Sequence, residues 1–145
     1  MKIVVLILII CLPVLAQSPT GLRQKYGPPM KESYLARDNV LATVTYNKDG
    51  QVCETVVEPL PPLTPIKSSE EKLKSDVLNE VLIEIIPMKE RGRLIMASFL
   101  NLNCLPRNDC GGTGEDYEKV YIYKNGGIDA HRYATIQWKN ASCGK

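Results

Sequence analysis

The chain has 145 residues, of which 18 are basic and 16 are acidic, giving a formal net charge of +2. This length suffices for one domain and is too short for two ordinary ones. The balanced charge, without a basic cluster, argues against a nucleic-acid partner, because nucleic-acid-binding proteins usually concentrate basic residues on one face.

The first sixteen residues have the pattern of a secretory signal peptide. Lys2 supplies a positive charge, residues 3–12 are apolar, and small or tolerated residues precede a cut after Ala16. Lipidation at Cys11 is a disfavoured alternative, because the residue before a lipidated cysteine is normally small. An apolar run this short does not span a bilayer. We therefore expect a periplasmic or secreted protein with no transmembrane span, and a single mature domain from 17 to 145.

A β-hairpin is predicted near the start of the mature chain. Residues 40–46 are rich in β-branched and aromatic types, and residues 51–57 supply the return strand. Asn47 to Gly50 (NKDG) between them has turn chemistry. Residues 58–65 (EPLPPLTP) then hold four prolines, which excludes a central strand and predicts an extended connector.

Residues 68–87 predict one long central helix on which the sheet packs. Ser68 and Glu71 have the spacing of a capping box, and Pro87 ends the helix. A helix lying on a membrane is the alternative, and the acidic polar face argues against it. The apolar residues recur with a helical period on one face, and they are Leu73, Val77, Leu78, Val81, Leu82, Ile85 and Ile86.

Three further strands are expected after the helix. Residues 94–102 are apolar on both alternating sets, which predicts a buried strand, with a helix as the alternative. Residues 104–114 have the composition of a loop. Residues 117–123 and 132–139 predict a hairpin, joined by a turn at residues 125–127 (NGG).

The predicted element order is ββαβββ. One helix on an antiparallel sheet buries the apolar faces of both most economically. The expected fold class is therefore α+β in two layers, with an antiparallel sheet packed on one long central helix.

The mature chain keeps four cysteines, at positions 53, 104, 110 and 143. An even number in an exported chain predicts two disulfides. If residues 117–123 and 132–139 pair, Cys110 and Cys143 flank the same end of that hairpin. The favoured pairs are therefore Cys110–Cys143 and Cys53–Cys104, and exchanging Cys104 with Cys110 stays open. No metal site is expected, because the cysteines form no close pairs and the sequence holds a single histidine.

The sequence contains no complete catalytic constellation. His131 lies two residues from Asp129, and these two are the only candidates for a hydrolase. A histidine on the surface is the favoured interpretation, since a base needs a nucleophile and an orienting group within reach. We therefore expect no cofactor and, more readily than an enzyme, a non-enzymatic protein.

Tyrosines on the predicted hairpin are the candidate binding residues. A tyrosine-rich sheet face could bind a protein or a glycan, although aromatic residues are common in strands without any such role. The four residues are Tyr117, Tyr121, Tyr123 and Tyr133.

Several short motifs resemble those of a group of small exported bacterial proteins with no known activity. They include YGPP at 26–29, Arg37, TVTY at 43–46, GQVC at 50–53, EP at 58–59, ERG at 90–92, YEKV at 117–120 and IQWK at 136–139. The resemblance covers most of the mature chain and implies no catalytic residues.

Residues 22–57 also resemble the helix-plus-hairpin unit of outer-membrane assembly lipoproteins and of β-lactamase inhibitor proteins. From all these features we expect a disulfide-stabilised binding or structural protein of the cell envelope, with an envelope protein or a glycan as partner. The alternatives are a secreted hydrolase using His131 and Asp129, and a protein inhibitor that docks through the tyrosines.

Overall fold

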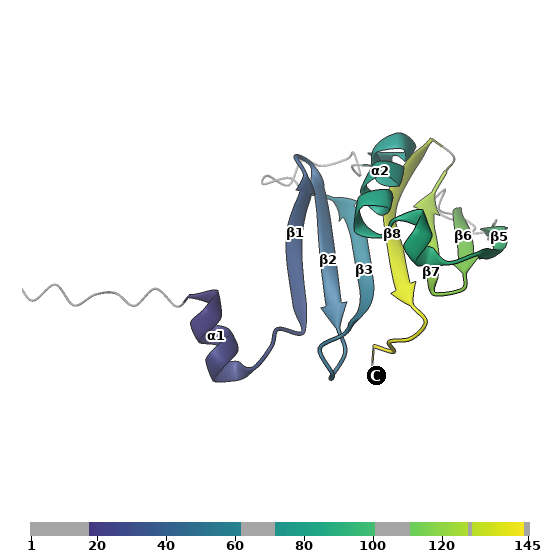
Figure 1. The fold of residues 1–145 in the computed structure, drawn as a ribbon. Coiled ribbons are helices and arrows are strands. Elements are labelled where there is room, and N and C mark those ends of the chain that lie inside the picture. Colours follow the sequence, from purple (N-terminus) through teal and green to yellow (C-terminus); the bar gives the residue numbers. More distant parts are fainter. Residues whose placement is uncertain (1–17, 62–71, 101–110, 128, 144–145) are drawn as a thin grey trace, which may run out of the picture.

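The computed structural model of the chain describes residues 18–61, 72–100, 111–127 and 129–143. These residues form one antiparallel sheet in the order β1-β2-β3-β8-β7-β6-β5, with the short strand β4 paired to β8 (Figure 1). The predicted α+β class with an antiparallel sheet is confirmed. The strands are β1 (Lys31–Arg37), β2 (Val40–Tyr46), β3 (Val52–Pro59), β4 (Leu73–Lys74), β5 (Leu94–Leu100), β6 (Gly112–Tyr117), β7 (Val120–Gly126) and β8 (Ala130–Trp138).

Within the described ranges, three short helices accompany the sheet: α1 (Pro19–Tyr26), α2 (Ser75–Ile85) and α3 (Met88–Arg91). Figure 1 shows α2 lying across the middle of one sheet face, with α1 set apart beside β1. None of the helices in the described ranges is long and apolar enough to cross a bilayer. The predicted signal peptide, residues 1–16, lies outside the described residues.

The predicted first hairpin is confirmed by β2 and β3, which pair with Ala42 opposite Val57. Its turn is closed by Asn47, whose Oδ1 accepts hydrogen bonds from the backbone N–H groups of residues 49 and 51 at 3.0 and 2.9 Å. Gly50 has a φ of 75°, which a glycine adopts without steric cost. Strand β3 continues to Pro59, so the first two residues of the predicted proline-rich connector belong to the sheet.

The central helix is shorter than predicted, because α2 begins at Ser75 and not at residue 68. Leu73 and Lys74 instead form β4, which pairs with the start of β8. This long-range backbone pairing competes with a helical start, and the helical periodicity of the sequence does not reveal it. The capping pair Ser68 and Glu71 lies outside the described residues. The predicted end is confirmed, since α2 stops at Ile85, two residues before the proline.

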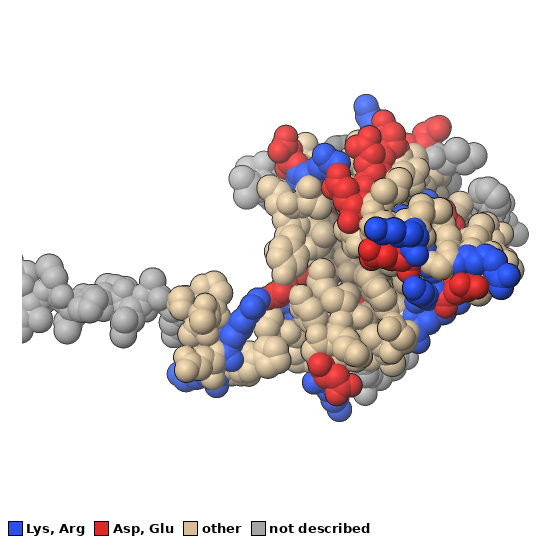
Figure 2. Space-filling model, in the orientation of Figure 1, with Lys and Arg blue, Asp and Glu red and all other residues tan. Residues whose placement is uncertain are grey.

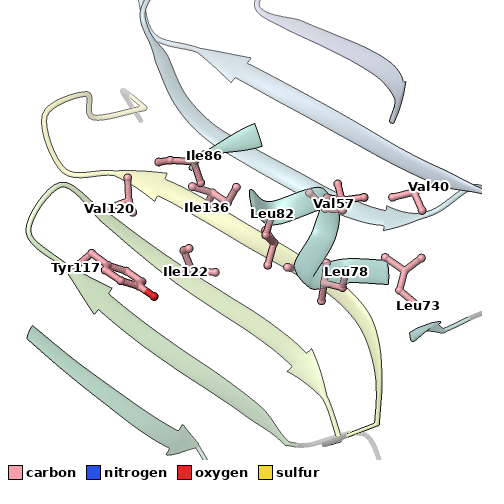
Figure 3. Packing of buried hydrophobic residues seen from close by; sticks show 12 residues of the cluster. Val40, Val57, Leu73, Leu78, Leu82, Ile86, Tyr117, Val120, Ile122 and Ile136 are labelled. Atoms are coloured by element: carbon pink, nitrogen blue, oxygen red, sulfur yellow. The ribbon is translucent and has the colours of Figure 1, made fainter. Parts of the chain in front are cut away.

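The core lies between α2 and the sheet, as Figure 3 shows. All seven apolar residues predicted from the helical period belong to it, with Val77 and Ile85 only partly buried. Each buried aliphatic side chain contributes about 1.5–3 kcal/mol of gross transfer free energy. The sheet side of the core comprises Val40, Val57, Tyr117, Val120, Ile122, Ala134 and Ile136.

Buried Arg91 stabilises the C-terminal end of α2. Its Nε donates to the carbonyl oxygen of Ile86 at 2.9 Å, and its Nη2 donates to that of Leu82 at 3.1 Å. These bonds satisfy carbonyl groups that a helix end leaves without intrahelical partners. The exposed side of α2 is acidic, as Figure 2 shows, and Arg37 at the end of β1 pairs there with Glu80 and Glu84.

Two predictions for the second half of the chain are wrong. Residues 94–100 do form a strand, but β5 is an edge strand, and Leu94 to Met96 are exposed rather than buried. Residues 112–114 were expected in a loop and form the start of β6. The rings of Tyr121 and Tyr123 occupy the space above Gly114 and Gly112, which explains how a glycine-rich segment holds its place in the sheet.

The structure forms a Cys53–Cys143 disulfide, with the two Cα atoms 5.2 Å apart. Both predicted pairings, Cys110–Cys143 with Cys53–Cys104 and the exchanged set, are therefore wrong. The physical reason is the strand order: β3 pairs with β8, so the start of β3 lies beside the end of the chain. Cys104 and Cys110 lie outside the described residues.

Candidate functional site

A cavity of about 460 Å³ lies between the first turns of α2 and strands β5, β6 and β7. Its volume falls in the range of small-molecule sites, roughly 300–1,000 Å³. Five glycines from β6, the end of β7 and the adjoining turns also line it. The polar residues that line it are Ser75, Asn79, Ser98, Thr113, Glu115, Lys124 and His131.

A lysine–glutamate ion pair forms the polar centre of the cavity. Lys124 Nζ lies 2.9 Å from Glu115 Oε1 and donates a second hydrogen bond to Asn79 Oδ1 at 3.0 Å. The side chains of Lys124 and Glu115 are only 12% and 23% exposed. An ammonium group has three donor hydrogens, and these contacts use two of them. Among the contacts of the described residues, one donor of Lys124 is therefore left for a molecule in the cavity.

Tyr117 connects the ion pair to the hydrophobic core. The Tyr117 hydroxyl donates to Glu115 Oε2 at 2.9 Å, and the Arg91 guanidinium lies over the Tyr117 ring, 5.6 Å from its centroid. Burial raises the pKa of Glu115, but the hydrogen bond and charge of Lys124 outweigh it, so the pKa lies below its ordinary value. Glu115 is therefore ionised at neutral pH, and its charge is compensated.

Ser75 and His131 form a second polar pair at the end of the cavity where α2 begins. The Ser75 backbone N–H donates to the carbonyl oxygen of Asp129 at 3.2 Å, and Ser75 Oγ lies 2.9 Å from His131 Nε2. His131 is only 5% exposed, so the prediction of a surface histidine is wrong. It is buried because β4 pairs with β8 at this position.

His131 is held in its neutral form. Burial, and then the nearby charge of Lys124, lower its pKa below the ordinary value. Its Nδ1 is buried without a hydrogen-bond partner, whether or not that nitrogen carries the proton. The contact with Ser75 forms in either tautomer: Nε2 donates to Oγ in one, and Oγ donates to Nε2 in the other. Only in the second tautomer can His131 act as a base toward Ser75.

The predicted pair of His131 and Asp129 is not formed. One ring nitrogen of His131 bonds to Ser75, and the other has no partner. Asp129 is exposed, and only its backbone carbonyl takes part in the site. The described part of the chain also holds no group of three or more residues suited to bind a metal.

The four candidate tyrosines do not share one face. The predicted strand 117–123 is two strands, β6 and β7, and the tight turn between them reverses the alternation. Tyr117 is therefore buried on the side of α2, among the core residues of Figure 3. Tyr121, Tyr123 and Tyr133 lie on the opposite face of the sheet, where the last two rings are 6.3 Å apart.

Of the three tyrosines on that face, Tyr121 and Tyr123 cover glycine backbone, and Tyr133 packs beside Tyr123. They are half-buried, and a Cβ atom added at Gly114 or Gly112 would lie 2.5 or 2.7 Å from the hydroxyl of Tyr121 or Tyr123. Their packing role is therefore evident from the structure. Whether they also bind a partner stays a prediction.

Sequence reasoning did not find the cavity residues other than His131. The helix was expected to start earlier, which concealed Ser75 as the first residue of α2. Residues 104–114 were expected in a loop and Glu115 in no strand, so Glu115 had no predicted neighbour on β7. The cavity has the geometry of a small-molecule site, with an apolar surround and a few polar groups. We found no protein-family model, curated protein or solved structure that matches the chain.

Proposed function

We propose that this is an exported, non-enzymatic binding protein whose cavity holds a small uncharged polar molecule. The observation that carries the proposal is the Lys124–Glu115 pair inside a cavity of ligand size. A buried ion pair is a weak source of stability, because desolvation offsets most of its attraction. A pair kept at the wall of a cavity is better explained by the hydrogen bonds it offers to a ligand.

The electrostatics of the cavity favour a ligand without net charge. Lys124 and Glu115 already neutralise each other, so a charged ligand would add an uncompensated charge in a poorly solvated site. Hydroxyl and amide groups, in contrast, can accept from the third donor of Lys124 and pair with the amide of Asn79. A neutral sugar or acetamido sugar has these groups, in agreement with a glycan as partner.

Export is supported by two independent features. Residues 1–16 have the composition of a signal peptide. The Cys53–Cys143 disulfide is of the kind that persists in oxidising compartments such as the periplasm or the extracellular space. N-terminal sequencing of the protein recovered outside the cytoplasm is expected to begin at Gln17.

Neighbouring positions on β5 provide a matched test of the cavity. Ala97 lines it, whereas Met96 precedes it in the strand and, in the β5–β6 register, pairs with Asp116 on the opposite face. Both residues are exposed, so a tryptophan is expected to be tolerated at either position. Ala97→Trp fills the mouth of the cavity, and Met96→Trp is the control.

The binding measurement is amide chemical-shift mapping by NMR. The uncharged probes are N-acetylglucosamine, glucose and N-acetylglycinamide, and the charged probes are citrate and arginine. We expect an uncharged probe to shift the amides of Gly112 and Gly114 in the native chain and in Met96→Trp, but not in Ala97→Trp. Binding of the charged probes alone, or equal shifts in both variants, would contradict the proposal.

A secreted hydrolase is the second candidate, favoured by the 2.9 Å contact between Ser75 Oγ and His131 Nε2. An activated serine would attack a fluorophosphonate at phosphorus, pass its proton to the histidine and expel fluoride. A binding protein is expected to show no such reaction. Intact-mass detection of a Ser75 adduct that disappears in His131→Ala would support the hydrolase instead of the binding protein.

A further inference from the structure

Strand β5 forms one outer edge of the sheet and pairs, among the described elements, with β6 alone. Its residues Leu94, Ile95 and Met96 are 48%, 59% and 58% exposed. An edge strand presents unpaired backbone donors and acceptors, which makes it a template for another strand. Exposed apolar side chains on such an edge add a reason for it to be covered.

The opposite edge strand, β1, carries charged residues, which β5 lacks. It contains Lys31, Glu32 and Arg37, and Glu32 also pairs with Arg23 from α1. Charged residues on an edge strand commonly prevent pairing with other chains. The β5 segment, LIMASFL, contains no charged residue and no proline.

We propose that β5 pairs antiparallel with β5 of a second copy of the chain, about a two-fold axis. Pairing centred on Ala97 places Met96 of each copy opposite Ser98 of the other, in the regular part of the strand that follows the register shift between Leu94 and Met96. Such an interface is isologous, so it closes as a dimer and leaves no further copy of this edge to pair.

The charges on the two edge strands explain why β5, and not β1, is expected to pair with itself. The same construction on β1, centred on Tyr34, would place Lys31 opposite Arg37 twice by symmetry. Like charges directly opposite each other destabilise a strand pair. Self-pairing of β5 brings no two like charges together within the strand.

The dimer would place the two cavities beside the two-fold axis, because Ala97 both lies at the centre of the pairing and lines the cavity. Each copy would then form part of the surroundings of the other cavity. The pairing itself uses backbone and apolar groups of β5. It does not depend on the cavity binding a ligand.

The test needs no ligand. It is analytical ultracentrifugation, over a range of protein concentrations, of the chain with its disulfide formed. Met96→Lys introduces a charge into the proposed ladder at an exposed position. Leu35→Lys is the matched control, because Leu35 is 61% exposed on the other edge strand, β1. We expect the native chain and the control to be dimers, and Met96→Lys to weaken association at least about tenfold, or about 1.4 kcal/mol.

Amide hydrogen exchange locates the interface independently. We expect exchange at residues 96–98 to slow as the concentration of the native chain rises, and not in Met96→Lys. A native chain that stays monomeric overturns the proposal. A dimer that both lysine substitutions weaken equally, or that neither weakens, places the interface elsewhere and also overturns it.

Discussion

The two halves of the sheet beneath α2 are filled in different ways. Over β2, β3 and β8 the helix meets aliphatic side chains such as Val40, Val57 and Ile136. Over β6 and β7 its first turns meet the Lys124–Glu115 ion pair and the cavity. The same helix therefore borders a packed core on one side and a polar site on the other.

The packed half therefore accounts for most of the stability of the fold, and the polar half for its capacity to bind a ligand. Close-packed aliphatic residues contribute most of the stabilisation, because each buries apolar surface without desolvating a charge. The polar half contributes little stability for its size, because its pair must first be desolvated. The packed half is expected to tolerate changes poorly, and the polar half to affect binding more than stability.

The largest expected effect is in the packed half. Leu82 is almost fully buried, whereas Ile83, the next residue on α2, is half exposed. Leu82→Ala removes a buried isobutyl group and leaves a cavity, which costs about 2–5 kcal/mol in the free energy of unfolding. Urea denaturation measures the loss, with Ile83→Ala as the control. Equal losses in the two variants would show that α2 is not seated as described.

The disulfide is expected to have the next largest effect, again in the packed half. It closes a loop with a sequence separation of 90 between β3 and the end of the chain. Replacing Cys53 and Cys143 by serine is expected to lower the free energy of unfolding by about 2–4 kcal/mol, chiefly by freeing the unfolded chain. Urea denaturation with and without reductant checks this. A native chain whose stability is insensitive to reductant would argue against the bond.

Breaking the ion pair probes the polar half. Lys124→Met leaves Glu115 partly buried without its partner, and we expect a loss of about 2–3 kcal/mol, below that of a fully buried pair. Adding Glu115→Leu removes the orphaned charge, so the double variant is expected to recover most of the loss. A double-mutant cycle in urea measures the coupling. Additive losses would mean that the two groups do not interact in solution.

The sequence predicted the packed half better than the polar half, for a physical reason. The 3.6-residue period of Leu78, Val81 and Leu82 is a local signal, and it placed these residues in the core. The start of α2, in contrast, depends on the pairing of Leu73 with His131, which lies far along the chain.

The candidate site and the disulfide depend on the same kind of long-range information. Lys124 meets Glu115 only because β6 and β7 are adjacent, and β6 begins with glycines whose composition indicated a loop. The strand order that places β3 beside β8 fixes the Cys53–Cys143 pair, and spacing along the sequence does not reveal it. Periodicity identified the apolar face of α2, but no local signal identified the strands against which that face packs.

The smallest expected effect is a difference in acid stability between the two halves. Lys124 lowers the pKa of Glu115 despite burial, so the Glu115 carboxylate contributes stability above its unfolded pKa and loses it as the pH falls through the folded value. Glu32, at the other side of the sheet, has its pKa lowered by hydrogen bonds from Tyr34 and Tyr46. Its cationic partner Arg23 is 58% exposed, against 12% for Lys124, so stronger solvent screening of that pair predicts a weaker contribution.

Urea denaturation between neutral pH and the acid range separates the two carboxylates. Glu115→Gln is expected to be less stable than the native chain at neutral pH and to lose less stability on acidification, because the titrating group is gone. Glu32→Gln is expected to change the acid limb in the same direction and by less. Equal reductions of the pH dependence in the two variants would contradict this prediction. They would mean that the stability of the polar half depends on its charges no more than the stability of the rest of the fold does.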